Sequence, residues 1–104
     1  MSETLEINTD MQIHARAAAN LLKAMANEHR LMIMCTLMDG ELRVGELNER
    51  VPLSQSALSQ HLASLREAGL VATRKESQTV YYKVNGTEAS KIIAVLQSIY
   101  CPTL

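Results

Sequence analysis

Apolar residues recur every three or four positions through the first two-thirds of the chain, a spacing typical of amphipathic helices. A first helix is predicted from Asp10 to Met25, because its apolar residues follow this spacing: Met11, Ala15, Ala18, Leu22 and Met25. A second helix is predicted from a cap at Asn27 to about Met38, ending before Gly40. Its apolar run at 31–35 covers most of the circumference, which indicates a central, buried helix.

Two shorter helices are predicted on either side of a tight turn at Pro52-Leu53. One covers Gly45 to Arg50, and the next runs from a cap at Ser54 to Ala68, with Gly69 as its left-handed stop. Within this fourth helix the leucines step by four and three and are expected to face the core: Leu58, Leu62 and Leu65.

Beyond Gly69 the period changes from helical to alternating. Val71 to Glu76 and Thr79 to Val84 are rich in β-branched residues and tyrosine, which predicts two strands joined at Ser77-Gln78. A final helix is predicted from about Thr87 to Tyr100, with Pro102 just beyond it. The expected fold is therefore mainly α with a β-hairpin wing, in the order ααααββα of a winged helix-turn-helix domain.

The final helix carries more apolar surface than so small a domain can bury internally. Its apolar residues cover more than one stripe: Ile92, Ile93, Val95, Leu96, Ile99 and Tyr100. The surplus is most economically buried against a second copy, with the alanine-rich first helix as packing partner. We therefore expect a homodimer whose interface uses the first and last helices of a domain at 10–104, after a flexible tail at 1–9.

Composition and charge narrow the class of protein. The length of 104 residues suits a single domain, and no segment approaches the roughly 20 apolar residues of a membrane span. The first ten residues lack the order of a signal peptide, so we expect a cytoplasmic protein without membrane contact. Although the net charge is −1, residues 43–84 are net positive, which places any anion-binding face in the middle of the chain.

The exposed face predicted for the fourth helix lacks the charges that a surface built for solubility usually carries. It presents only short or uncharged side chains before Glu67: Gln55, Ser56, Ser59, Gln60 and Ala63. Compact amides and hydroxyls can reach base edges in the major groove without repelling phosphates. The pattern favours DNA recognition over an idle polar surface, whereas His61 fits either a contact to the DNA backbone or a packing role.

A hairpin directly after two helices and a turn is the order of a winged DNA-binding domain. Arg74 and Lys75 would then lie near flanking phosphates or the minor groove, although an ordinary solvated hairpin carries such residues equally well. The expected partner is double-stranded operator DNA. A redox-insensitive winged-helix module used only for protein contacts is an alternative, which a salt-dependent DNA-binding assay would separate.

The stretch Leu53-Ser-Gln-Ser-Ala-Leu-Ser-Gln-His-Leu62, followed by Leu65-Arg66 and Gly69-Leu70-Val71, resembles the ArsR/SmtB family of bacterial transcriptional regulators. The resemblance covers nearly the whole chain and implies a dimeric winged-helix regulator that changes its grip on operator DNA when an inducer arrives. By position it assigns groove reading to residues 55, 56 and 59–61. The complete candidate DNA-binding set is Ser54, Gln55, Ser56, Ser59, Gln60, His61, Arg66, Arg74 and Lys75.

Metal sensing is the alternative function within that family. Metal-sensing members carry a Cys-Val-Cys pair near the third helix, where this chain has Arg43 and Gly45, or Asp and His ligands along the last helix, which here has no histidine. The chain's histidines are scattered without ligand spacing: His14, His29 and His61. We therefore predict no metal and no other cofactor.

The two cysteines lie far apart in sequence and form no disulfide framework and no C-x-x-C motif. From position alone Cys35 is expected to be an inert thiol in the apolar stripe of Leu31 and Met38, and Cys101 to be accessible. Their placement, with the Ile-Tyr-Cys-Pro ending, resembles the BigR/YgaV/HlyU branch of the family. That resemblance implies a cysteine pair that senses oxidants or reactive sulfur species, with repression and relief of silencing both open as outputs.

An enzymatic role for either thiol is not expected. A nucleophilic cysteine needs a base and an orienting group beside it, and neither cysteine has a histidine nearby in the sequence.

Overall fold

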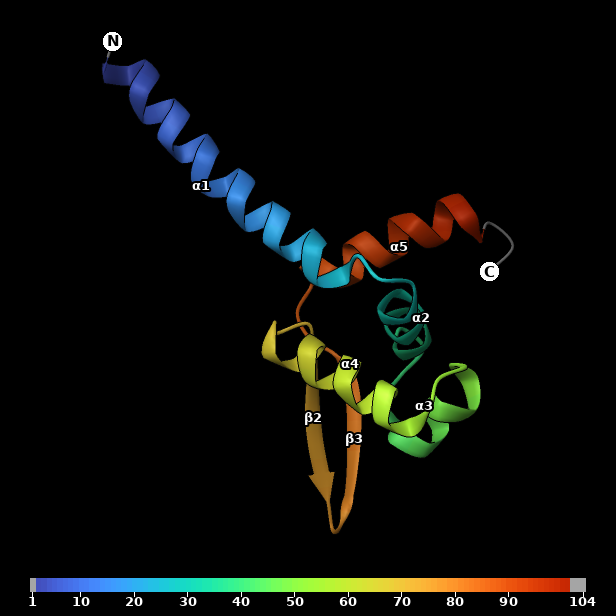
Figure 1. The fold of residues 1–104 in the computed structure, drawn as a ribbon. Coiled ribbons are helices and arrows are strands. Elements are labelled where there is room, and N and C mark those ends of the chain that lie inside the picture. Colours follow the sequence, from blue (N-terminus) through green and yellow to red (C-terminus); the bar gives the residue numbers. More distant parts are fainter. Residues whose placement is uncertain (1, 102–104) are drawn as a thin grey trace.

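Five helices and a small sheet make up the part of the chain that the structure describes, which is residues 2–101 of a computed structural model, with side chains from Thr9 onward. The order is α1 (Ser2–Met25), α2 (Glu28–Leu37), β1 (Leu42–Arg43), α3 (Val44–Arg50), α4 (Gln55–Glu67), β2 (Val71–Glu76), β3 (Thr79–Val84) and α5 (Glu88–Tyr100) (Figure 1). The mainly helical winged helix-turn-helix prediction is confirmed, with β1 as an addition. Pro102, predicted to follow the last helix, lies outside the described residues.

Helix α1 is longer than its apolar spacing indicates. It begins at Ser2 instead of Asp10, so the predicted tail is helical from its second residue. No glycine or proline interrupts residues 2–25, and the lack of an apolar stripe does not by itself end a helix. In Figure 1 the N-terminal half of α1 projects away from the rest of the chain. Within the described residues, no helix is both long and apolar enough to cross a membrane.

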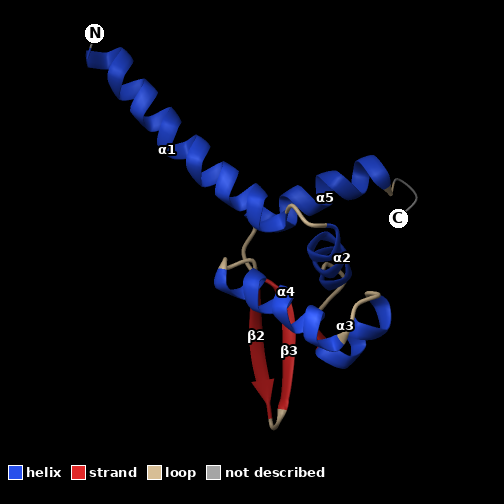
Figure 2. Ribbon diagram, in the orientation of Figure 1, coloured by secondary structure: helices blue, strands red, loops and turns tan. Residues whose placement is uncertain are grey.

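The sheet is antiparallel with strand order β1-β3-β2. Figure 2 shows the hairpin of β2 and β3. Strands β2 and β3 pair along their full length, from Val71 opposite Val84 to Glu76 opposite Thr79, as the alternating pattern predicts. The turn at Ser77 takes a left-handed backbone with φ of 57°. Strand β1 was not predicted, because two residues are too short to show a period and their pairing with β3 is a tertiary contact.

The core lies where α2, α4 and α5 meet the sheet. Seven side chains from these helices are at most 1% exposed: Ile33, Met34, Leu58, Leu62, Leu65, Ala89 and Ile93. The predictions of a central second helix and of an inward leucine stripe on the fourth are thereby confirmed. Because the stripe fixes the rotation of α4, the opposite face of that helix must point to solvent.

Helices α1 and α5 keep large apolar side chains in solvent. Those more than half exposed are Met11, Ile13 and Leu22 on α1, and Val95, Ile99 and Tyr100 on α5. The Cα radius of gyration is 16.5 Å, whereas a compact domain of this length has about 13 Å. The predicted surplus of apolar surface is therefore present in the single chain.

Candidate nucleic-acid interface and thiol cavity

Helix α4 is held at both ends by the residues that the sequence indicated. The Ser54 hydroxyl accepts a hydrogen bond from the Ala57 backbone N–H at 3.2 Å, which caps the helix. At the other end Gly69 has a φ of +78°, the left-handed conformation that glycine adopts without strain. These two stops give α4 a defined length in front of the wing.

The exposed face of α4 gathers most of the predicted DNA-reading residues. Ser54, Gln55, Ser56, Ser59 and Gln60 are all exposed. The hydroxyls of Ser54 and Ser56 lie 3.4 Å apart. The face therefore presents amide and hydroxyl groups with no carboxylate until the last residue of the helix.

His61 lies at the edge of this face and is half-buried. Its Nδ1 accepts a hydrogen bond from Arg30 Nε at 3.3 Å, and Arg30 Nη1 donates to the Ala24 carbonyl at 3.1 Å. The ring centroids of His61 and His29 are 6.0 Å apart. Burial, and after it the charges of Arg30 and His29, hold the pKa of His61 below its usual value. His61 therefore contacts Arg30 and His29 within the subunit, and Arg30 is a partner that the sequence did not reveal.

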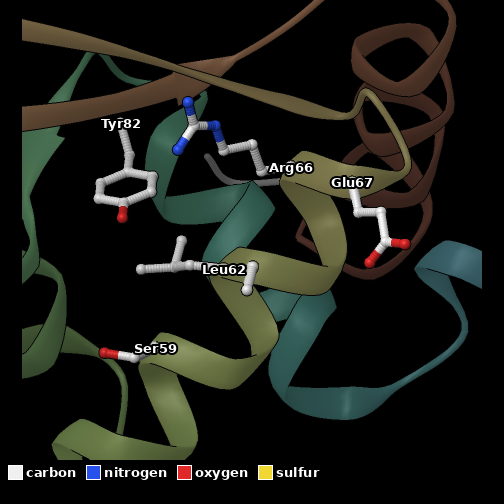
Figure 3. A pocket seen from close by; sticks show the side chains of 6 residues that line it. Ser59, Leu62, Arg66, Glu67 and Tyr82 are labelled. Atoms are coloured by element: carbon white, nitrogen blue, oxygen red, sulfur yellow. The ribbon is translucent and has the colours of Figure 1, made fainter.

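A cleft of about 380 Å³ separates α4 from the wing (Figure 3). Its lining comprises Ser59, Leu62, Ala63, Arg66, Glu67 and Tyr82. In Figure 3 the Arg66 side chain extends toward Tyr82, whereas Glu67 points away from both. The predicted DNA contact Arg66 therefore lies beside the exposed polar face of α4, in the cleft between this helix and the hairpin.

The two predicted wing cations differ in their surroundings. Lys75 is exposed and has no ion pair among the residues that the structure describes. Arg74 is paired with Glu41 and with Glu76, and its guanidinium lies over the Tyr81 ring. Of the two predicted wing cations, Lys75 alone is therefore without an ion pair in the described structure.

Cys35 and Cys101 line the same cavity, although 65 residues separate them in the sequence. Its volume is about 510 Å³, and Thr36, Asp39, Arg50 and Gln97 complete the wall. Both cysteines are free thiols and both are half-buried. Cys35 packs against the hydrophobic core together with Leu31 and Met38, as the predicted stripe requires, and it also lines the cavity that it shares with Gln97 and Cys101.

The surroundings of Cys35 favour its protonated form. Burial raises the pKa of the Cys35 thiol, the nearby Cys101 raises it further, and a hydrogen bond from the Gln97 side chain acts in the opposite direction. A thiol with a raised pKa is a weaker nucleophile at neutral pH than an ordinary cysteine. Neither Arg50 nor Gln97 was singled out from the sequence, since only the fold brings them to the cysteines.

Metal ligation has no cluster to support it within the described part of the chain. No group of three histidine, cysteine or acidic side chains there could hold an ion.

Comparison with known proteins places this geometry among regulators of transcription. Residues 27–73 match the model of the bacterial regulatory protein arsR family, a segment that includes α2, α3 and α4. The transcriptional activator HlyU of Vibrio cholerae is 58% identical over 92 residues, which are 88% of this chain and 85% of HlyU. The structure of reduced HlyU from that organism superposes with a TM-score of 0.84, covering 88% of this chain and 97% of that one.

Two further solved structures share the fold. The transcriptional repressor BigR from Xylella fastidiosa is 39% identical, with a TM-score of 0.82 over 90% of this chain and 96% of BigR. The homodimeric winged helix-turn-helix DNA-binding domain of Mb0332 from Mycobacterium bovis is 28% identical, with a TM-score of 0.75 over 86% of this chain and 82% of that one. These relatives are described as regulators of transcription, or as possible ones, and not as enzymes.

Proposed function

The chain belongs to the ArsR family of bacterial transcriptional regulators, and we propose that it reads a specific operator through α4 as a homodimer and changes its DNA affinity when Cys35 and Cys101 become linked. The observation that carries the DNA-binding part is the exposed, carboxylate-free face of α4 between Ser54 and Gln60. The observation behind the switch is the shared cavity of the two thiols.

Sequence reading is assigned to the amides of α4. A glutamine can bond adenine in two places, and serine can donate to a base or to a phosphate, so Gln55 and Gln60 would read bases while Ser54, Ser56 and Ser59 serve either role. His61 would act from behind this face, because its Nδ1 is already bonded to Arg30. A neutral ring there keeps a second positive charge away from the Arg30 guanidinium.

Phosphate contacts are assigned to Arg66 and Lys75. Residues two apart on a strand share a face, so Lys75 lies on the same side of β2 as Thr73, which pairs with Tyr82 of the α4 cleft. Arg66 lies in the same cleft from the helix side. Arg66 of α4 and Lys75 of the wing would thus both contact the DNA backbone, while the amides of α4 contact the bases.

The homodimer is supported by the apolar faces that α1 and α5 leave in solvent. Leu22, Val95, Ile99 and Tyr100 are 52–77% exposed, and α1 extends beyond the rest of the chain. A second copy related by a twofold axis would cover these faces and place two recognition helices on one side. Two copies of α4 would then meet half-sites about one turn of DNA apart, as in other helix-turn-helix dimers. The relative Mb0332 is described as homodimeric.

The chemistry of the switch follows from the unequal environments of the thiols. Cys101, which follows the last turn of α5, would attack the oxidant first, and Cys35 would resolve the product. With a peroxide, Cys101 becomes a sulfenic acid, and the Cys35 sulfur then displaces water to form the disulfide. In total two thiols lose two protons and two electrons, and the peroxide is reduced to an alcohol and water. A hydropersulfide RSSH would accept the same electrons and leave as RSH and H₂S.

A bridge between the cysteines can act as a signal only if it favours one arrangement of helices over another. Cys35 lies on α2, which packs against both α4 and α5, and Cys101 follows α5, which carries exposed apolar surface. Linking them would fix α5 relative to the support of the recognition helix. In a dimer, the distance between the two copies of α4 would change with the angle between α5 and α2.

Selection of binding sites from random duplex DNA, first with reduced protein, tests the proposal. We expect an inverted repeat, and an affinity that changes about tenfold after peroxide or hydropersulfide treatment, a typical size for allosteric coupling. Cys35→Ser and Cys101→Ser should bind the reduced-state operator and show no change. Mass spectrometry of the linked peptide verifies the bridge, and an unaltered affinity in a bridged wild type would refute the switch.

A further inference from the structure

Arg74 is the most heavily bonded side chain on the wing. Its Nε donates to both carboxylate oxygens of Glu41 at 3.1 Å, and its Nη2 donates to Glu41 as well. Its Nη1 donates to Glu76 Oε2 at 2.8 Å. The guanidinium carbon lies 4.5 Å from the centre of the Tyr81 ring, within the range of a cation–π contact. We refer to Arg74, Glu41, Glu76 and Tyr81 as the wing clasp.

The wing clasp spans the width of the sheet on the side away from α4. Arg74 of β2 pairs in register with Tyr81 of β3, and Arg43 of β1 pairs with the same tyrosine. Tyr82, one residue further along β3, lines the cleft of α4, so Tyr81 and Arg74 occupy the opposite face. Glu41 directly precedes β1. The clasp therefore ties the edge strand of the wing to the segment that joins α2 to β1.

The charges of the wing clasp do not suit a phosphate anchor. Two carboxylates surround the guanidinium, so the charge of Arg74 is already paired and is not free for a phosphate. The hydrogen bond from Arg74 is the main reason why the pKa of Glu41 lies below its usual value, which keeps that carboxylate ionised. Lys75, one residue along the chain, faces the α4 side and has no such partner in the described structure.

We propose that Arg74 is a positioning residue for DNA recognition, which holds the wing at a fixed distance from α4 through the wing clasp and makes no phosphate contact of its own. The proposal rests on the DNA-binding function inferred above. Its physical basis is entropic: a wing that is already fixed loses less freedom when Lys75 meets the backbone, and preorganisation of this kind strengthens binding.

The first test compares Arg74→Gln with Lys75→Gln by measuring operator affinity over a range of salt concentrations. A phosphate contact contributes about 0.9 to the slope of log affinity against log salt, so Lys75→Gln should lower the slope by about 0.9 per subunit. Arg74→Gln should weaken operator binding about fivefold with the slope unchanged, because the freed wing must then lose conformational freedom when it binds DNA. A slope lowered by Arg74→Gln as much as by Lys75→Gln would overturn the proposal.

The second test asks whether Glu41→Gln strengthens or weakens DNA binding. Glu41→Gln removes a negative charge, so simple repulsion predicts tighter binding to all DNA. Loss of the clasp predicts weaker binding to the selected operator, and a double variant Glu41→Gln/Arg74→Gln no weaker than Arg74→Gln alone. Tighter operator binding by Glu41→Gln, or multiplicative losses in the double variant, would overturn the proposal.

A matched control is available at the other end of β1. Arg43 Nε and Glu46 Oε1 form an exposed pair at 3.2 Å that joins β1 to α3 and includes none of the four clasp side chains, although the Arg43 backbone pairs with Tyr81. Arg43→Gln should therefore leave the ratio of operator to random-DNA affinity unchanged, whereas Arg74→Gln should lower it; the reverse pattern counts against the clasp.

All affected side chains are partly exposed, and melting curves establish that the variants are folded. If wild-type protein selects no sequence, the DNA-binding function fails; if wild type binds and the clasp variants match it, the clasp alone fails.

Discussion

Ile99 offers a direct test of how α5 assembles. This side chain is 59% exposed near the end of α5, next to Tyr100, which is 77% exposed. Replacement by alanine removes most of the apolar area of this one side chain and leaves the internal core, where Ile93 is fully buried, unchanged. Ile99→Ala should therefore weaken the homodimer and leave the fold of each subunit intact.

The size of the effect follows from the exposed area. Full burial of an isoleucine contributes about 1.5–3 kcal/mol, and a little over half of Ile99 remains to be covered by a partner. Truncation to alanine should cost about 1–1.5 kcal/mol for each copy. A twofold interface contains two copies, so the dimer should lose about 2–3 kcal/mol, which raises its dissociation constant about 30- to 150-fold.

Sedimentation equilibrium over a range of protein concentrations measures that constant. Lys91→Ala, an exposed substitution near the start of the same helix, is the control and should leave it unchanged. A wild type that stays monomeric at micromolar concentration with operator DNA present would refute the dimer. Equal dissociation constants for wild type and Ile99→Ala would refute the use of this face.

Three further outcomes are expected. Ser54→Ala removes the cap of α4 and should lower the free energy of unfolding by about 1 kcal/mol in urea titrations, and an unchanged stability would contradict the role of the 3.2 Å bond. The pKa of His61 is lowered in the folded state, so its neutral form contributes stability that is present above about pH 6.5 and lost as the pH falls. Between pH 7.5 and 5 the free energy of unfolding should therefore fall more for wild type than for His61→Gln. Parallel curves of this free energy against pH for the two proteins would count against the prediction. A Cys35–Cys101 disulfide closes a loop of about 66 residues and should raise the free energy of unfolding by about 4 kcal/mol in the chain-entropy model. A urea titration without reductant measures this gain, and a bridge that gives no gain would indicate strain in the folded state.

Local signals were sufficient to predict the recognition helix and the hairpin. Ser54 and Gly69 bracket α4 through chemistry that acts within four residues, and the leucine stripe sets its rotation. The strands at 71–76 and 79–84 likewise follow from alternation and β-branching. Each of these features is encoded by neighbours in the sequence, which is why the exposed face of α4 could be identified before the fold.

Contacts between distant segments could not be predicted in the same way. Nothing near Glu41 in the sequence indicates that it meets Arg74, 33 residues away, and Arg30 lies 31 residues from His61. From their charge alone, Arg74 and Lys75 were equivalent candidates for a contact with a DNA phosphate. The alternation of side chains along β2 separates them, because it turns Lys75 toward α4 and Arg74 toward two carboxylates.

Helix α2 connects the two sites that a thiol-controlled regulator would require. Near its first turn Arg30 bonds His61 on the recognition helix, and its second half carries Cys35 in the cavity shared with Cys101. A helix of ten residues is a stiff element, so a tilt imposed at the cysteine end reaches the Arg30 end with little loss. A movement of α5 would therefore shift α2 and, through it, α4, provided that the core around Ile33 and Met34 has two packed arrangements. The bond between Arg30 and His61 is the place to detect it, because a helix tilt that switches DNA binding must alter that contact while the buried leucines of α4 stay in place.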